Sequence, residues 1–238
     1  MGSRLKRGTS PRNRNEALES VLSKYLEAIY CRPDSIAYLS DLPKSFDAMG
    51  LSENLLKGIR EYGFVEPFLI QRRGIVPFCA GENLILESTS PSGKTVTSCL
   101  GILQRVDGAL VQCQALVLVP DVANGKKIAE LIRRLGVHLG IEVHEFTRET
   151  VDDEDREVLF HVALATPDLG SRLFRERSIS CDSIKMILVS KGETTIVQYV
   201  YEVLDIFKLF PSDVQVCCSI LNPIRALTLK PPLLLLDI

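Results

Sequence analysis

Residues 83–103 read NLILESTSPSGKTVTSCLGIL, which predicts a buried strand, a loop and a helix in immediate succession. The apolar run at 83–86 suits the strand, and apolar residues at helical spacing follow Lys94. The loop at 88–95 has the form SxxxxGKT. This is nearly the pattern of a loop that binds phosphate through backbone N–H groups at a helix N-terminus.

The candidate phosphate-binding residues are Ser92, Gly93, Lys94 and Thr95. In such a loop the lysine contacts the outer phosphates of a nucleotide, and the hydroxyl of Thr95 is a weak candidate metal ligand. Pro91 departs from the pattern, because proline has no N–H to donate and its φ is fixed near about −65°. The alternative interpretation is a chance Gly-Lys-Thr at the start of a helix.

Strand-like and helix-like segments alternate along the rest of the chain. Apolar runs that suit buried strands lie at 83–86, 115–119, 142–146, 162–165, 186–189 and 214–218, and a run at 233–236 suits an edge strand. Amphipathic stretches that suit helices lie at 53–62, 71–78, 94–103, 125–139, 152–160, 169–175 and 199–209. This alternation predicts an α/β fold with a mostly parallel sheet, helices on both faces, and ligands outside the carboxyl ends of the strands.

The N-terminal region differs in composition from this main domain, which we place at 46–238. Residues 1–14 are rich in Lys and Arg and contain no acid, which predicts a disordered basic tail or, alternatively, a nuclear-targeting or polyanion-binding arm. Residues 15–45 form a predicted extension with one helix at 15–30, capped by Asn15. The net charge of −2 argues against a free-standing nucleic-acid-binding protein.

The seven cysteines are scattered, and their number is odd. This usage indicates a reducing compartment, which means a cytoplasmic or nuclear protein. No apolar stretch reaches the roughly 18 residues that a membrane helix needs, so we expect no membrane association.

The segment 63–71, GFVEPFLIQ, resembles the adenine-reading Q motif of DEAD-box helicases, in which Gln71 and the upstream aromatic Phe46 match. Further matching segments are QCQALVLVP at 112–120, IKMILV at 184–189 and LDIFKLFPSDVQV at 204–216. On these segments the chain resembles DEAD-box RNA helicases of the translation initiation factor 4A subfamily, from about residue 46 to about residue 236. The resemblance implies a single RecA-like P-loop NTPase domain. It also implies that Phe46 and Gln71 contact the adenine base of a bound ATP or ADP.

The resemblance also implies that the catalytic motif is degenerate. Where the family has Asp-Glu-Ala-Asp to hold magnesium and activate water, this chain has Ser190, Lys191, Gly192 and Glu193. A hydroxyl and an ammonium group supply neither function, so we expect no catalytic residues, no magnesium and only weak nucleotide binding. Lys191 either neutralises phosphate charge in place of the metal or points to solvent.

The RNA-contacting motifs of the family are altered as well. Its Ser-Ala-Thr, Pro-Thr-Arg-Glu-Leu-Ala and paired glycines read SIL at 219–221, PDVANG at 120–125 and RE at 148–149. Its Thr-Pro-Gly-Arg reads TPDL at 166–169, so Thr166 and Pro167 are the remnants of the RNA contacts. Because Asp121 and Asp168 would repel phosphate, we expect RNA binding to be weak or absent.

Three functions are compatible with this pattern. The first is a non-catalytic module that acts through protein partners of an initiation-factor or RNA-processing assembly. The second is an RNA helicase or ATPase in which Glu193 serves the metal or the water and a partner supplies the second lobe, with its arginine fingers, that we expect this chain to lack. The third is a truncated relic without function.

Overall fold

The computed structural model describes residues 29–31, 42–88, 92–148, 159–210 and 213–221. Within these residues, seven strands form one sheet in the order β1-β2-β7-β6-β3-β5-β4. All neighbouring strands pair in parallel, which confirms the predicted parallel α/β fold. The strands are β1 (Ile29–Cys31), β2 (Leu84–Glu87), β3 (Ala115–Leu118), β4 (Val143–Glu145), β5 (Val162–Ala165), β6 (Met186–Val189) and β7 (Gln215–Ile220).

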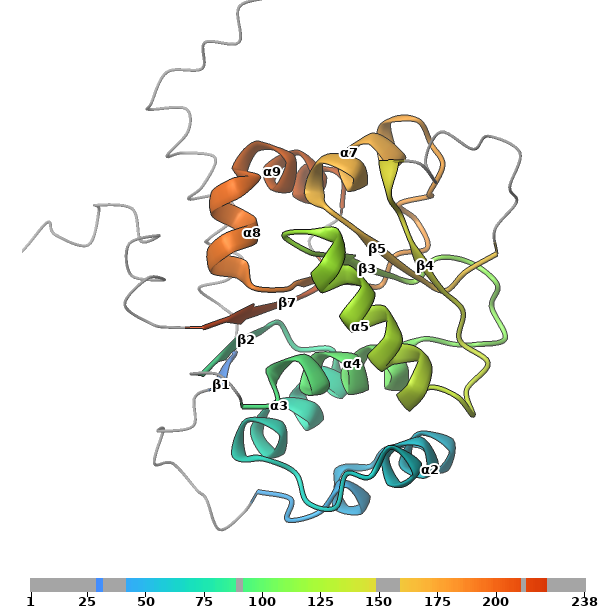
Figure 1. Cartoon of the computed structure of the whole chain (residues 1–238), viewed down its shortest axis with the longest axis vertical. Coiled ribbons are helices and arrows are strands. Elements are labelled where there is room, and N and C mark those ends of the chain that lie inside the picture. The colour runs from blue at the N-terminus through green and yellow to red at the C-terminus, as the bar shows by residue number, and fades with distance from the viewer. Residues whose placement is uncertain (1–28, 32–41, 89–91, 149–158, 211–212, 222–238) are drawn as a thin grey trace, which may run out of the picture.

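Helices cover both faces of the sheet, as the sequence predicts (Figure 1). One face carries the 3-10 turn η2 (Phe46–Met49) and helices α2 (Glu53–Tyr62), α3 (Leu69–Ala80), α4 (Lys94–Arg105) and α5 (Val122–Leu135). The other face carries helices α7 (Pro167–Arg175), α8 (Gly192–Gln198) and α9 (Val200–Leu209).

Two hydrophobic clusters lie on opposite sides of the sheet because successive side chains of a strand point to opposite faces. In β3, Ala115 and Val117 belong to the cluster beneath α2–α5, whereas Leu116 and Leu118 belong to the cluster beneath α7–α9. Every residue of β2, β3, β5 and β6 is buried, which explains why these strands read as continuous apolar runs.

The predicted helix at 15–30 is wrong at its end. Ile29–Cys31 is a strand, β1, and it pairs in parallel with β2 with Ile29 opposite Leu84. Pairing with the open edge of β2 satisfies backbone groups of both strands, and β-branched and aromatic residues such as Ile29 and Tyr30 suit that conformation. The helical spacing of the apolar residues therefore did not determine the local structure here.

Other element boundaries also differ from the predictions. Helix α5 starts at Val122, three residues before the predicted 125, because Asp121 caps it, and helix α8 was not predicted. Leu159 and Phe160 lie in irregular chain before β5, not in the predicted helix at 152–160. The rest of that helix, the tail at 1–14 and the edge strand at 233–236 lie outside the described residues. No helix of the described ranges is long and apolar enough to cross a membrane.

Candidate nucleotide-binding site

The sequence motifs converge on one edge of the sheet, because the carboxyl ends of parallel strands lie at the same edge. The residues at these strand ends are Ser88 after β2, Asp121 near the end of β3, Thr166 after β5, Ser190 after β6 and Leu221 after β7. The candidate phosphate loop and the degenerate motif at 190–193 are therefore brought together.

The described part of the phosphate loop holds its lysine between two oxygens. Gly93 is the N-cap of helix α4 and has a φ of +86°, a left-handed conformation that favours glycine. The ammonium group of Lys94 donates to the carbonyl oxygen of Ser88 and, at 3.2 Å, to the hydroxyl oxygen of Ser92. Burial lowers the pKa of Lys94, and the nearby carboxylate of Glu193 opposes that shift. Contact of this lysine with a phosphate group at the start of the helix stays a prediction.

Thr95 is exposed in the first turn of helix α4. That position is accessible to a ligand at the phosphate loop. Its role as a metal ligand stays a prediction.

Gln71 lies directly against the phosphate loop. Its side chain is only 2% exposed, and its Oε1 accepts a hydrogen bond from the backbone N–H of Phe68 at 2.7 Å. A Cβ atom on Gly93 would lie 2.7 Å from the Nε2 atom of Gln71, so the amide faces the loop at close range. Gln71 is thus fixed beside the loop, and its contact with a base stays a prediction.

Phe46 is placed differently from Gln71. Its ring is 3% exposed and belongs to the core cluster beneath α2–α5, with its centroid 6.4 Å from that of Phe64. A direct contact of this ring with adenine stays a prediction. Phe68, beside the loop, is an aromatic residue that is 63% exposed. The sequence motifs did not identify it as a candidate. The only signal for it was an aromatic residue within the segment GFVEPFLIQ.

The degenerate motif begins with Ser190 and Lys191, whose backbone is firmly held. Ser190 is buried, and its carbonyl oxygen accepts a hydrogen bond from the hydroxyl of Thr195 at 2.6 Å. Lys191 has a φ of +48°, and its N–H donates to the hydroxyl oxygen of Ser219 at 3.2 Å, while its side chain is exposed. The turn from β6 into α8 therefore leaves Lys191 exposed at the carboxyl edge of the sheet.

Gly192 and Glu193 complete this turn. A Cβ atom on Gly192 would lie 2.3 Å from the sulfur of Cys218, so helix α8 approaches strand β7 too closely for any side chain. Glu193 is half-buried, and its Oε2 accepts a hydrogen bond from the N–H of Leu221 at 3.2 Å. Glu193 is therefore the carboxylate of the motif, and Lys94 is the cation whose pKa it affects.

Metal-binding chemistry is sparse at this edge. Among the residues that the structure describes, no three His, Cys, Asp or Glu side chains are grouped so that they could hold a metal ion. Ser190 and Lys191 offer a hydroxyl and an ammonium group, and neither suits a divalent cation that prefers carboxylate oxygens. That magnesium does not bind here stays a prediction.

The remaining predicted residues have structural roles. Asp121 caps helix α5 by accepting from the N–H of Asn124 at 2.8 Å, and this hydrogen bond lowers the pKa of the Asp121 carboxyl group. Thr166 is the buried N-cap residue of α7, and Pro167 stands at the first helical position, which proline suits. Asp168 lies 3.9 Å from the guanidinium group of Arg148. RNA contacts by Thr166 and Pro167 stay a prediction.

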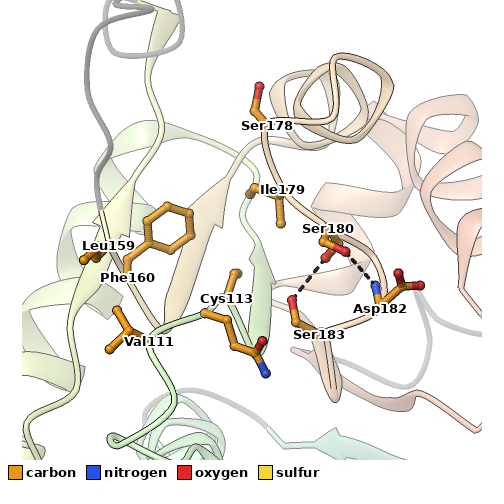
Figure 2. Close-up of a pocket in the computed structure, with 10 residues that line it drawn as sticks. Val111, Cys113, Leu159, Phe160, Ser178, Ile179, Ser180, Asp182 and Ser183 are labelled. Carbon is orange, nitrogen blue, oxygen red and sulfur yellow. Dashed lines mark hydrogen bonds between the residues drawn. The ribbon is translucent and has the colours of Figure 1, made fainter.

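A separate cavity of about 340 Å³ lies at the opposite edge of the sheet (Figure 2). Cys113, Phe160 and Ser183 line it and precede strands β3, β5 and β6, so it opens at the amino ends of the strands. Burial raises the pKa of the Cys113 thiol to about 12, so the thiol is protonated and unreactive near neutral pH. The cavity contains none of the predicted site residues.

A parallel sheet with helices on both faces, and a phosphate-loop sequence after β2, define a RecA-like α/β domain. The family of DEAD/DEAH box helicases matches this chain over residues 68–218, and the chain belongs to that family. The predicted resemblance to DEAD-box helicases is thereby confirmed.

Relatives of known sequence support this assignment. The chain is 38% identical over 213 residues to eukaryotic initiation factor 4A-1 of Arabidopsis thaliana, covering 88% of this chain and 52% of the relative. It is 42% identical over 187 residues to eukaryotic initiation factor 4A of Zea mays, covering 77% and 46%. The chain thus spans about half the length of these relatives.

Solved structures share the fold. Dbp5 of S. cerevisiae bound to Gle1 and IP6 has a TM-score of 0.72 at 22% identity, covering 80% of this chain and 51% of that chain. A DEAD box protein from Methanococcus jannaschii has a TM-score of 0.71 at 18% identity, covering 79% and 53%. These similarities confirm the predicted RecA-like fold.

Proposed function

We propose that this chain is a degenerate helicase ATP-binding domain, related to the first RecA-like domain of initiation factor 4A, that holds an adenine nucleotide weakly and does not hydrolyse it. The observation that carries the proposal is the turn after β6, where Ser190 and Lys191 follow Val189 at the carboxyl edge. In such a pseudoenzyme, ATP or ADP would serve as a ligand that stabilises the domain.

The absence of hydrolysis follows from the chemistry of this turn. Phosphoryl transfer needs a metal to neutralise developing charge and a base to orient the attacking water. A serine hydroxyl has no charge to anchor a divalent cation, and a lysine ammonium group accepts no proton from water. Glu193 is the remaining carboxylate of the motif, and it already accepts a hydrogen bond from the N–H of Leu221.

Weak nucleotide binding follows from the groups that remain. Lys94 and Ser92 can contact phosphate, Gly93 lets the loop turn into helix α4, and Gln71 is fixed beside it. The exposed ammonium group of Lys191 can neutralise phosphate charge, so binding would not require magnesium.

The proposed partners are proteins of an initiation-factor or RNA-processing assembly. Among proteins of the same fold, Dbp5 has been solved with Gle1 and Nup159, and also with RNA. For this chain we favour protein partners over RNA, because Asp121 and Asp168 stand where the family has phosphate-contacting motifs. The site of action would be the cytoplasm or the nucleus.

A hydrolytic function is the second candidate, and the position of Glu193 favours it. This carboxylate is near enough to Lys94 to influence its pKa, so it lies at the phosphate side of the motif. A partner that supplies a second lobe would then complete an RNA-dependent ATPase.

Two measurements on the purified chain test the proposal. Phosphate release from ATP, with and without RNA, is expected to stay at background, and titration calorimetry is expected to detect ATP binding that magnesium does not strengthen. Lys94→Ala should abolish this binding. ATP turnover by the unaltered chain that disappears in Lys94→Ala would overturn the proposal and support the second candidate.

A gain-of-function variant provides the matched control. Ser190→Asp combined with Lys191→Glu restores two carboxylates at the end of β6 without changing Gly192 or Glu193. Magnesium is then expected to strengthen ATP binding about tenfold, which corresponds to about 1.4 kcal/mol. If magnesium strengthens ATP binding equally in both proteins, the two lost carboxylates are not the reason for the weak metal site.

A further inference from the structure

Asp121 and Lys191 stand where two neighbouring strands end. Strands β3 and β6 pair in parallel with Leu118 opposite Val189, and the N–H of Ser190 donates to the carbonyl oxygen of Leu118 at 2.9 Å. Asp121 follows β3, and Lys191 follows β6, within a few residues of this last pairing. An acidic and a basic side chain therefore leave the same edge of the sheet from neighbouring strand ends.

Hydrogen bonds fix the backbone beneath both side chains. Asp121 is the N-cap residue of α5, and its carboxylate accepts from the N–H of Asn124 at 2.8 Å. Lys191 is the N-cap residue of α8, with a φ of +48°, and its N–H donates to the hydroxyl oxygen of Ser219 at 3.2 Å. The carboxylate is therefore held in place, while the flexible stem of the lysine gives its ammonium group a range of positions.

The two charges influence each other. The pKa of the Asp121 carboxyl group is lowered first by its hydrogen bond from the N–H of Asn124 and further by the positive charge of Lys191. Both side chains are exposed, so the ammonium group is also accessible to a second anion. In the proposed nucleotide site that anion is a phosphate group, which has to attract Lys191 in the presence of Asp121.

We propose that Asp121 sets the affinity of the nucleotide site, because its carboxylate competes with the nucleotide phosphates for Lys191. This inference rests on the proposed function, in which Lys191 neutralises phosphate charge. Asp121 acts through the lysine and contacts no ligand, so it is a positioning residue. Without its charge, the ammonium group is attracted by the phosphates alone and binds them more tightly.

A double-mutant cycle on the purified chain tests this inference. ATP and inorganic tripolyphosphate are titrated calorimetrically into the unaltered chain, Asp121→Asn, Lys191→Met and the double variant. Asp121→Asn keeps a capping oxygen but loses the charge, and it is expected to strengthen the binding of both ligands about two- to fivefold, the range of an exposed ion pair. In the Lys191→Met background the same change is expected to have little effect, because the lysine through which it acts is gone.

The salt dependence gives a readout that a purely structural role of Asp121 would not change. The gain in Asp121→Asn should shrink as the salt concentration rises from about 50 mM to about 500 mM, because salt screens interactions between exposed charges. A gain that stays constant over this range would contradict an electrostatic role.

Glu130→Gln is the matched control, because it removes one exposed carboxylate further along helix α5. It should leave both affinities unchanged. Equal affinity of Asp121→Asn and the unaltered chain would overturn this inference and leave the proposed function standing. An equal gain with and without Lys191 would show that Asp121 repels phosphate directly, which also overturns it. Binding of neither ligand by the unaltered chain would remove the proposed function as well.

Discussion

At the scale of single residues, Gly192 shows how the site edge depends on packing. Helix α8 starts at Gly192, and strand β7 passes so close that a Cβ atom would fall 2.3 Å from Cys218 Sγ and 3.2 Å from Ile220 Cγ2. Neither neighbour can move freely, because both belong to a fully buried strand. The short residue at this position is therefore required by the fold, independently of any chemistry.

Gly192→Ala is expected to destabilise the protein by about 1–3 kcal/mol through overpacking. The measurement is the free energy of unfolding from urea denaturation. Gly125→Ala is the control, because its Cβ atom would make an ordinary contact at 3.5 Å with Val119 inside helix α5. That change should be neutral or stabilise by about 0.5–1 kcal/mol. Equal stability of the two variants would contradict the close approach of α8 to β7.

Residue-scale prediction from sequence succeeded where a local motif fixes the geometry. The pattern SxxxxGKT placed Lys94 at the start of a helix, and the structure has it there. The exposure of Phe68 and the burial of Phe46 depend on how α3 and η2 pack, and no local pattern encodes that packing. The predicted repulsion of phosphate by Asp121 stays a prediction, and the structure adds that this residue caps helix α5 by accepting from the N–H of Asn124.

At the scale of secondary-structure elements, the cap of helix α5 is the most direct consequence of a changed motif. Asp121 follows strand β3 after Pro120 and accepts the N–H of Asn124, one of the donors that the first turn leaves unsatisfied. The carboxylate also interacts favourably with the positive end of the helix dipole.

Asp121→Ala is expected to lower the free energy of unfolding by about 1 kcal/mol, because the cap is lost. Asp121→Asn retains a capping oxygen and should lose only part of that stability. Thermal and urea denaturation at neutral pH measure both. If Asp121→Ala is as stable as the unaltered chain, the helix does not depend on this cap.

Strands were predicted correctly from the sequence where all of their residues are buried. The apolar runs of β3, β5 and β6 were recognisable because helices cover both faces of the sheet. Helix α8 was missed because it is only seven residues long and starts inside the motif at 190–193. Strand β1 was assigned to a helix because its pairing with β2 is a long-range interaction, which spacing of apolar residues does not report.

At the scale of the whole molecule, several cysteines contribute to the packed interior. Cys113 and Cys218 are buried, and burial raises the pKa of each thiol to about 12. The unfolded chain would ionise these thiols near their ordinary pKa of 9.0. Stability from these groups is thus complete below pH 9 and is lost as the pH rises toward 12.

The native state is therefore expected to weaken under alkaline conditions. Each fully buried thiol should remove about 1.4 kcal/mol of unfolding free energy per pH unit above its unfolded pKa. Urea denaturation at several pH values between 7 and 10.5 checks this. Cys113→Ala should reduce the slope with pH whatever its effect on stability at pH 7, while Cys181→Ala, at a half-exposed position, should change it less. An unchanged slope in Cys113→Ala would contradict the burial of that thiol.

The separation of the two apolar layers by the sheet has a practical consequence for redesign. Each layer is assembled from side chains of the strands and of the helices that cover them, whereas the candidate ligand-binding groups stand just past the strand ends. Exchanging exposed residues of that rim, such as Thr95 and Lys191, changes charge and ligand preference without disturbing either layer. The domain can therefore be used as a stable carrier on which phosphate, base and metal subsites are installed one at a time.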